Sequence, residues 1–177
     1  MGKEPYSVRI LVADGDPEGI RIVEQPNWSG TGIVYPCPRW ADARERSEFD
    51  AAGMYLLVGE PADGGRLPTI AIGGGDPLRE QIDAALDSPA PWSWGVAFVS
   101  RGDWLGAGHI CRIVFALRRW AASSGRCQLR DATLPPEPPV TEREAAEARA
   151  FQDEMLRLLP LIGLRAVVIP QGDGVSP

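Results

Sequence analysis

The chain has 177 residues, of which 44% are hydrophobic and 24% are charged, and its formal net charge is −6. These values are typical of a soluble protein with one domain, or with one domain and a small appendage. No apolar run is long enough to cross a membrane, and the first ten residues lack the apolar segment of a secretory signal. We therefore expect a cytoplasmic protein with no membrane partner. The negative charge also disfavours nonspecific nucleic-acid binding, which depends on neutralising phosphates.

The first 50 residues are expected to form an N-terminal β extension. Alternating apolar and β-branched residues predict a hairpin, with strands at residues 6–13 and 20–24 around a turn rich in glycine and aspartate. A third short strand is expected at residues 32–35. The mixed charges and aromatic residues of positions 39–49 favour a short surface helix.

Residues 51–133 are expected to form the core. Apolar runs predict strands at residues 54–58, 69–72 and 94–99, with a long hairpin loop between the first two. The three glycines at positions 73–75 predict a tight turn, and Asp76 is expected to cap the helix that follows it. A second helix is expected over residues 103–122. Its apolar stripe is formed by Ile110, Ile113, Val114, Leu117 and Ala121.

Residues 134–177 are expected to add a proline-rich linker and a helix that packs on the core. The stretch LPPEPPV predicts a stiff connection, and Thr141 with Glu144 forms a capping box that starts a helix running to about residue 159. Residues 166–169 are a candidate edge strand. Together these elements predict an α+β fold, in which helices flank a small mixed or antiparallel sheet.

Cysteine and histidine are scarce. The chain has three cysteines and one histidine, and no two cysteines form a CxxC pair. This count disfavours a Cys/His zinc site, and an odd number of cysteines disfavours a disulfide scaffold. We expect free thiols in or near a core, and neither a bound metal nor a cofactor.

Six segments follow one another in a specific order: DGDPEGIRIVE, GMYLLVGE, IGGGDPLREQI, WGVAFVSRGD, the helix from His109, and FQDEMLRLLPLIGL. This order resembles the GIY-YIG nuclease family, in particular a bacterial subgroup with an N-terminal β extension. The resemblance covers nearly the whole chain. It implies metal-dependent hydrolysis of a phosphodiester bond, with a magnesium ion held by a helical glutamate and assisted by a tyrosine and an arginine.

The catalytic residues that the resemblance implies are mostly substituted. The first tyrosine of the family motif matches Tyr55, but the second matches Ala71, which has no hydroxyl. The arginine matches Gln81, and the metal-binding glutamate matches Val114 within the apolar stripe. Arg79 is two residues from Gln81, about 200° around a helix, and is expected to face elsewhere. The asparagine that commonly follows the second helix in the family has no clear match.

These losses predict a nuclease-like domain that no longer cleaves, and that serves as a binding or regulatory module. Within residues 104–130 there is no aspartate or glutamate that could replace the missing metal ligand. The partner would be a protein or DNA, and the oligomeric state stays open.

Two alternatives remain. The first is an active, magnesium-dependent DNA endonuclease with a rearranged site, in which Tyr55 and His109 act with nearby carboxylates. The candidate carboxylates are Asp76, Glu80, Asp83 and Asp103. The second is an enzyme of another class whose GGGD turn holds a phosphate at a helix N-terminus.

A basic cluster is the candidate nucleic-acid surface. Between residues 104 and 130 there are five arginines and no acidic residue. Three of them recur every seven residues and would stay near one face of a helix. The five are Arg112, Arg118, Arg119, Arg126 and Arg130.

Overall fold

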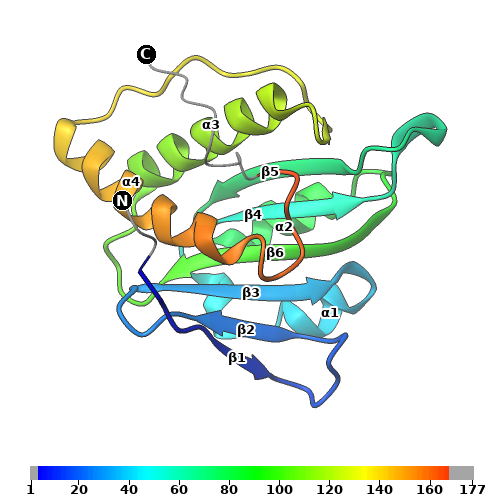
Figure 1. Ribbon diagram of the computed structural model, residues 1–177, viewed down its shortest axis with the longest axis horizontal. Coiled ribbons are helices and arrows are strands. Elements are labelled where there is room, and N and C mark those ends of the chain that lie inside the picture. The colour runs from blue at the N-terminus through cyan, green and yellow to red at the C-terminus, as the bar shows by residue number, and fades with distance from the viewer. Residues whose placement is uncertain (1–3, 168–177) are drawn as a thin grey trace.

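A seven-stranded mixed sheet runs through the centre of the protein, whose computed structural model describes residues 4–167 (Figure 1). The strand order is β1-β2-β3-β6-β4-β5-β7. All neighbours are antiparallel except β5 and β7, which are parallel. The strands are β1 Arg9–Val12, β2 Arg21–Glu24, β3 Gly30–Pro36, β4 Gly53–Gly59, β5 Thr69–Gly75, β6 Trp92–Ser100 and β7 Gln128–Leu129.

Helices cover both faces of this sheet, so the predicted α+β fold is confirmed (Figure 1). The four α-helices are α1 Trp40–Ala43, α2 Leu78–Leu86, α3 Ala107–Ser124 and α4 Glu142–Leu158. Three short 3₁₀ segments accompany them, η1 Cys37–Arg39, η2 Ser47–Asp50 and η3 Ala62–Gly64. No helix in residues 4–167 combines the length and the apolar character that crossing a bilayer requires.

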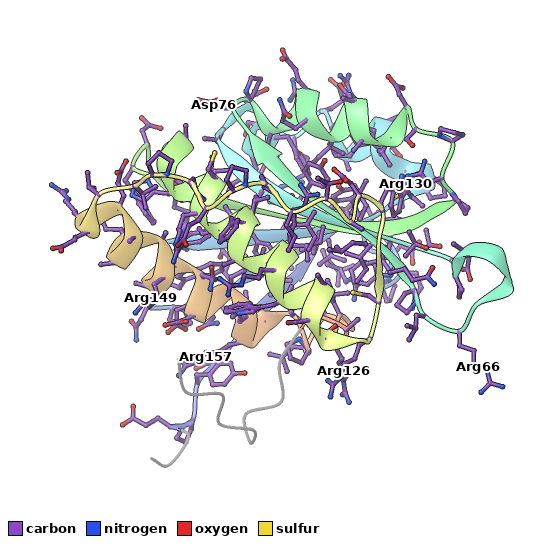
Figure 2. All side chains as sticks on the ribbon, turned by 90° about the horizontal axis from the view of Figure 1, so that it is seen from above. Arg66, Asp76, Arg126, Arg130, Arg149 and Arg157 are labelled. Carbon is purple, nitrogen blue, oxygen red and sulfur yellow. The ribbon has the colours of Figure 1, made fainter. Side chains whose placement is uncertain are left out.

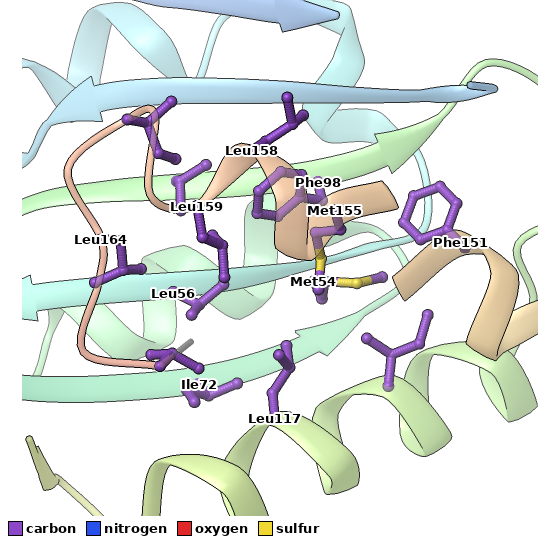
Figure 3. Close-up of a cluster of buried hydrophobic side chains, with 14 of the residues drawn as sticks. Met54, Leu56, Ile72, Phe98, Leu117, Phe151, Met155, Leu158, Leu159 and Leu164 are labelled. Atoms are coloured by element: carbon purple, nitrogen blue, oxygen red, sulfur yellow. The ribbon is translucent and has the colours of Figure 1, made fainter. Parts of the chain in front are cut away.

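The larger hydrophobic core lies between the sheet and helices α3 and α4. Met54 and Leu56 of β4 and Phe98 of β6 point into it from the sheet, and Leu117 of α3 and Met155 of α4 meet them (Figure 3). All five side chains are fully buried. Strand β4 is buried along its whole length, which explains why its sequence is a continuous apolar run without polar alternation.

A second core, on the opposite face, lies under α1, η2 and α2. Its centre is an aromatic group in which Trp40 and Phe49 meet edge to face, with ring centroids 4.9 Å apart, and Tyr35 of β3 packs against both. Leu78 and Ile82 of α2 complete it. Both faces of the central strands are therefore covered.

The N-terminal strands continue the same sheet. β3 pairs with β6 over its full length, from Gly30 opposite Ser100 to Pro36 opposite Trp94. At the far edge, all four residues of β1 are exposed. The predicted hairpin and third strand are confirmed, although β1 is shorter than expected.

Four local predictions are wrong. The helix expected over residues 39–49 is broken into η1, α1 and η2, with an irregular link at 44–46. The glycines at 73–75 continue β5 and form no turn. Asp76 does not cap α2; Pro77 holds the N-cap position, no side chain caps the helix, and the first amide, that of Leu78, donates to the Ala51 carbonyl at 3.0 Å. Residues 166 and 167 form a turn where a strand was expected, while 168 and 169 lie outside the described residues.

Helix α4 begins as predicted. The Glu144 amide donates to the Thr141 hydroxyl at 3.2 Å, and the Thr141 amide donates to the Glu144 carboxylate at 2.9 Å. This reciprocal capping box satisfies two amides that a helix start leaves unpaired. The local sequence alone therefore defines where α4 starts.

Candidate functional site

A hollow of about 350 Å³ lies beside the β5 edge of the sheet. We call it the Tyr55 hollow. It gathers residues from β4, β5, α2, α3 and the segment that follows β7. The lining includes Tyr55, Ala71, Gly73, Gln81, Ser88, Arg118, Arg130 and Asp131.

Tyr55 reaches this hollow because Gly73 lies opposite it on β5. A Cβ atom on residue 73 would meet the Tyr55 hydroxyl at 2.5 Å, so any other residue there would require the ring to move. Burial raises the pKa of Tyr55 above its usual value of 10.0, and the neighbouring Arg118 cation opposes that shift. The phenol is therefore neutral at physiological pH, and it can donate or accept a hydrogen bond.

The positions that the nuclease resemblance matches to the second tyrosine and to the arginine also line the Tyr55 hollow. These are Ala71 on β5 and Gln81 on α2. The first offers a methyl group and the second an uncharged amide, so neither supplies a phenol or a cation. Arg79 faces elsewhere, as expected, because its guanidinium pairs with Asp50 at 2.9 Å.

The best-buried cation of the hollow is Arg118 on α3, whose side chain is 15% exposed. Its guanidinium contacts the Asp131 carboxylate at 3.1 Å and donates to the carbonyls of Asp131 and Thr133 at 2.8 and 2.9 Å. A hydrogen bond from the Thr133 amide and the Arg118 contact hold the pKa of Asp131 below its usual value. Arg118 thus ties the segment after β7 to α3.

Val114 lies one helical turn before Arg118, on the same side of α3. It is half-buried and packs against the larger core. The position that the resemblance matches to the metal-binding glutamate therefore holds a side chain used for packing.

His109 lies apart from Tyr55, where the first turn of α3 meets the second turn of α4. The Gly106 amide donates to its Nδ1 at 3.1 Å, so the ring proton is on Nε2. That nitrogen donates to the Glu147 carboxylate at 2.9 Å. Both ring nitrogens are engaged in holding helices, and the structure does not bring the two retained candidates, Tyr55 and His109, into one site.

None of the four carboxylates of the endonuclease alternative lines the Tyr55 hollow. Asp83 accepts from Arg44 at 2.8 and 3.2 Å and from the Trp40 indole at 2.7 Å, and these bonds, that of Arg44 first, lower its pKa. Within residues 4–167, Asp131 is the acidic residue that lines the Tyr55 hollow. Among the side chains that the structure describes, no group of three or more from His, Cys, Asp or Glu could hold a metal ion. The three cysteines are free, and Cys37 and Cys127 pack against the cores.

The five arginines of the expected basic cluster do not share one surface. Arg118 and Arg130 line the Tyr55 hollow, whereas Arg112 and Arg119 line a groove between α3 and α4. Figure 2 shows Arg130 and Arg149, which also lines the groove, on opposite sides of α3. Arg126 lies beyond the C-terminal end of α3 (Figure 2). Any ligand that uses these cations therefore meets two separate sites.

Sequence reasoning did not find the role of Asp131 or the contribution of Ser88, whose hydroxyl accepts from Arg130 at 2.9 Å. Both depend on β7, which places residues 130–133 against the hollow. Two residues are too few to give a strand pattern. The only local signal was Asp131 itself, since an aspartate can accept from the amide two residues later, as the Thr133 amide does here at 3.0 Å.

Comparison of this chain with protein-family models, with curated proteins and with solved structures finds no match.

Proposed function

We propose that this chain is a GIY-YIG nuclease-like domain that has lost strand cleavage and acts as a binding or regulatory module. The observation that supports this most directly is the composition of the Tyr55 hollow. Three positions matched to catalytic groups, 55, 71 and 81, converge there from three different elements. Only the first holds the group that hydrolysis needs.

Two of the three charged side chains that line the hollow, Arg118 and Asp131, are paired with each other, and the third, Arg130, donates to the Ser88 hydroxyl. Arg118 is bonded to Asp131, and the same carboxylate accepts a hydrogen bond from the Thr133 amide. Metal-assisted hydrolysis needs oxygen ligands that converge on one ion and a cation that meets the charge built up on phosphorus. Releasing Arg118 or Asp131 for either task would break the contact that holds residues 131–133.

The test is a cleavage assay with supercoiled plasmid and with single-stranded DNA, each in magnesium and in manganese. We expect no cleavage above buffer, and no difference between the wild type and Tyr55→Phe. Cleavage that the Tyr55→Phe variant loses, and that chelation of the metal abolishes, would overturn the proposal. Arg66→Gln, a change in the exposed β4–β5 loop, is the matched control for contaminating nuclease (Figure 2).

The salt dependence of DNA binding distinguishes a DNA partner from a protein partner. Binding of labelled duplex DNA is measured at several salt concentrations. Each phosphate contact contributes to a fall in affinity as salt rises, so a steep slope supports DNA as the partner. Absent binding, or a slope near zero, favours a protein partner.

A further inference from the structure

The groove between α3 and α4 is larger than the Tyr55 hollow, with a volume of about 600 Å³. The two helices touch near their N-terminal turns, where His109 meets Glu147, and then diverge (Figure 1). Residues 112, 116, 119 and 123 form one wall at helical spacing, and residues 145, 149 and 152 form the other. This α3–α4 groove has a size typical of a small-molecule site.

Cations dominate its polar lining. Arg112 and Arg119 come from α3 and Arg149 from α4, and none of the described residues that line the groove is acidic. Arg112 is paired with Glu137 of the linker and lies over the Phe115 ring, 5.9 Å from its centroid. Arg119 and Arg149 have no hydrogen-bond or ion-pair partner within residues 4–167. The groove thus keeps two unneutralised guanidinium groups, which suit a phosphate.

Gln152 gives an independent indication of a ligand. It lies on α4, lines the groove and is only 6% exposed. Its side-chain amide has no hydrogen-bond partner among the described residues. Its amide atoms are not sealed from solvent, so a ligand in the groove that offers both a donor and an acceptor can bond to them.

The apolar part of the groove comes from aromatic side chains. Trp120 is half-buried at the edge of the larger core, and Phe115 is buried beneath Arg112. An indole face at the side of a cationic groove is a surface on which a planar base can stack.

We propose that the α3–α4 groove binds a nucleoside 5′-monophosphate unit, either as a free nucleotide or as the 5′ end of a single strand. The phosphate lies between Arg119 and Arg149. The base packs against Trp120, and the Gln152 amide bonds to its edge. The proposal stands apart from the nuclease-like assignment, because none of these side chains lines the Tyr55 hollow.

In the experiment, the full chain is titrated with each of the four ribonucleoside 5′-monophosphates. Calorimetry and tryptophan fluorescence measure the binding. We expect at least one to bind, with fluorescence quenched by stacking on Trp120. Arg149→Gln and Gln152→Leu should each weaken binding by at least about tenfold, since each removes one anchoring contact. Arg66→Gln should leave affinity unchanged.

Further ligands separate the two sources of the nucleotide unit. Adenosine and inorganic phosphate, each tested alone, should bind more weakly than the monophosphate. Tighter binding of a 5′-phosphorylated single-stranded oligonucleotide than of the free nucleotide assigns the site to a strand end, and the reverse assigns it to the metabolite. Both outcomes support the proposal.

Three results would overturn it. The first is that neither the monophosphates nor the oligonucleotide bind at concentrations up to about 5 mM, because a dissociation constant above that value is too weak for a functional nucleotide site. The second is equal affinity for adenosine. The third is affinity unchanged in Arg149→Gln, a variant whose substituted side chain is on the surface and whose fold is checked by thermal unfolding.

Discussion

The two sites beside α3 contain adjacent arginines in opposite situations. Arg118 faces the Tyr55 hollow, where a carboxylate and two carbonyls occupy its guanidinium. Arg119 faces the α3–α4 groove, where no group among residues 4–167 pairs with it. One position along a helix turns the side chain by about 100°, so two neighbours can serve different purposes. A cluster of arginines in a sequence therefore does not define a cationic surface.

The largest expected change in stability comes from a substitution in α3, the helix that both sites share. Ile113 is fully buried on the core-facing side of α3, between the two sites. We expect Ile113→Ala to lower the free energy of unfolding by about 2–5 kcal/mol, through lost burial and the cavity it leaves. Chemical denaturation measures this. Because α3 forms one side of both sites, the variant should also raise the rate of amide hydrogen exchange in the residues around the Tyr55 hollow and around the α3–α4 groove. A rise at one site alone would show that the two sites do not depend equally on α3.

The next largest effect is expected from a substitution that changes the Tyr55 hollow and leaves the α3–α4 groove intact. Gly73→Ala places a Cβ atom 2.5 Å from the Tyr55 hydroxyl, which is closer than two such atoms can approach. We expect a loss of about 1–3 kcal/mol in unfolding free energy from overpacking. In a Tyr55→Ala background the same substitution should cost much less, because the clash is gone. Equal costs in the two backgrounds would show that the ring does not depend on the glycine.

The adjacent arginines offer a matched pair of substitutions. Arg118→Met removes three polar contacts to residues 131–133, and we expect it to lower the unfolding free energy by about 1–2 kcal/mol. Arg119→Met, one residue later, should change it by no more than about 0.5 kcal/mol. Urea denaturation of both variants measures the difference. Equal effects would refute the claim that only Arg118 has a structural role.

The smallest effect is a dependence on pH. Asp131 has a pKa below its usual 3.8, because of the Thr133 amide and then of Arg118. A depressed pKa means that the carboxylate stabilises the fold above the unfolded-state value, and that this contribution is lost as pH falls through the folded pKa. The wild type should therefore be slightly more stable than Asp131→Asn near neutral pH. The difference should vanish in strong acid, as followed by urea midpoints from about pH 7 to about pH 2.5.

A double variant provides the control for this pH effect. With Arg118→Met already present, the pH-dependent difference caused by Asp131→Asn should shrink, since one of its causes is removed. If the stability difference caused by Asp131→Asn grew towards acid pH in either background, the lowered pKa of Asp131 would not be its cause.

Much of the fold was predictable from the sequence because local patterns and tertiary packing agree there. The apolar run of β4 and the capping box of α4 each define an element through its own residues. The failures lie where packing overrides local preference. Gly73 to Gly75 have poor strand propensity, yet they extend β5 because β4 pairs with all three and Tyr55 needs the space over the first.

The site was predictable only in part, for a similar reason. The resemblance matched residues 55, 71 and 81 to catalytic positions one by one, and the structure has all three in the lining of one hollow. Gln152 carried no sequence signal, because a glutamine on a mixed helix face is ordinary until the packing of α4 against α3 places it in the lining of a groove. The unequal roles of Arg118 and Arg119 depend on Asp131, which only the short strand β7 brings near.

That short strand also makes the two edges of the sheet unequal. β7 occupies backbone groups at the start of β5, where the Gln128 amide donates to the Pro68 carbonyl and the Arg130 amide to the Ile70 carbonyl, both at 2.9 Å. At the other edge, β1 presents a strand with exposed Ile10 and Leu11 side chains. An uncovered, apolar edge strand is a template for adding further strands. At high concentration, strand addition between molecules should therefore start at β1, and a lysine in place of Leu11 is the simplest way to keep the protein in solution.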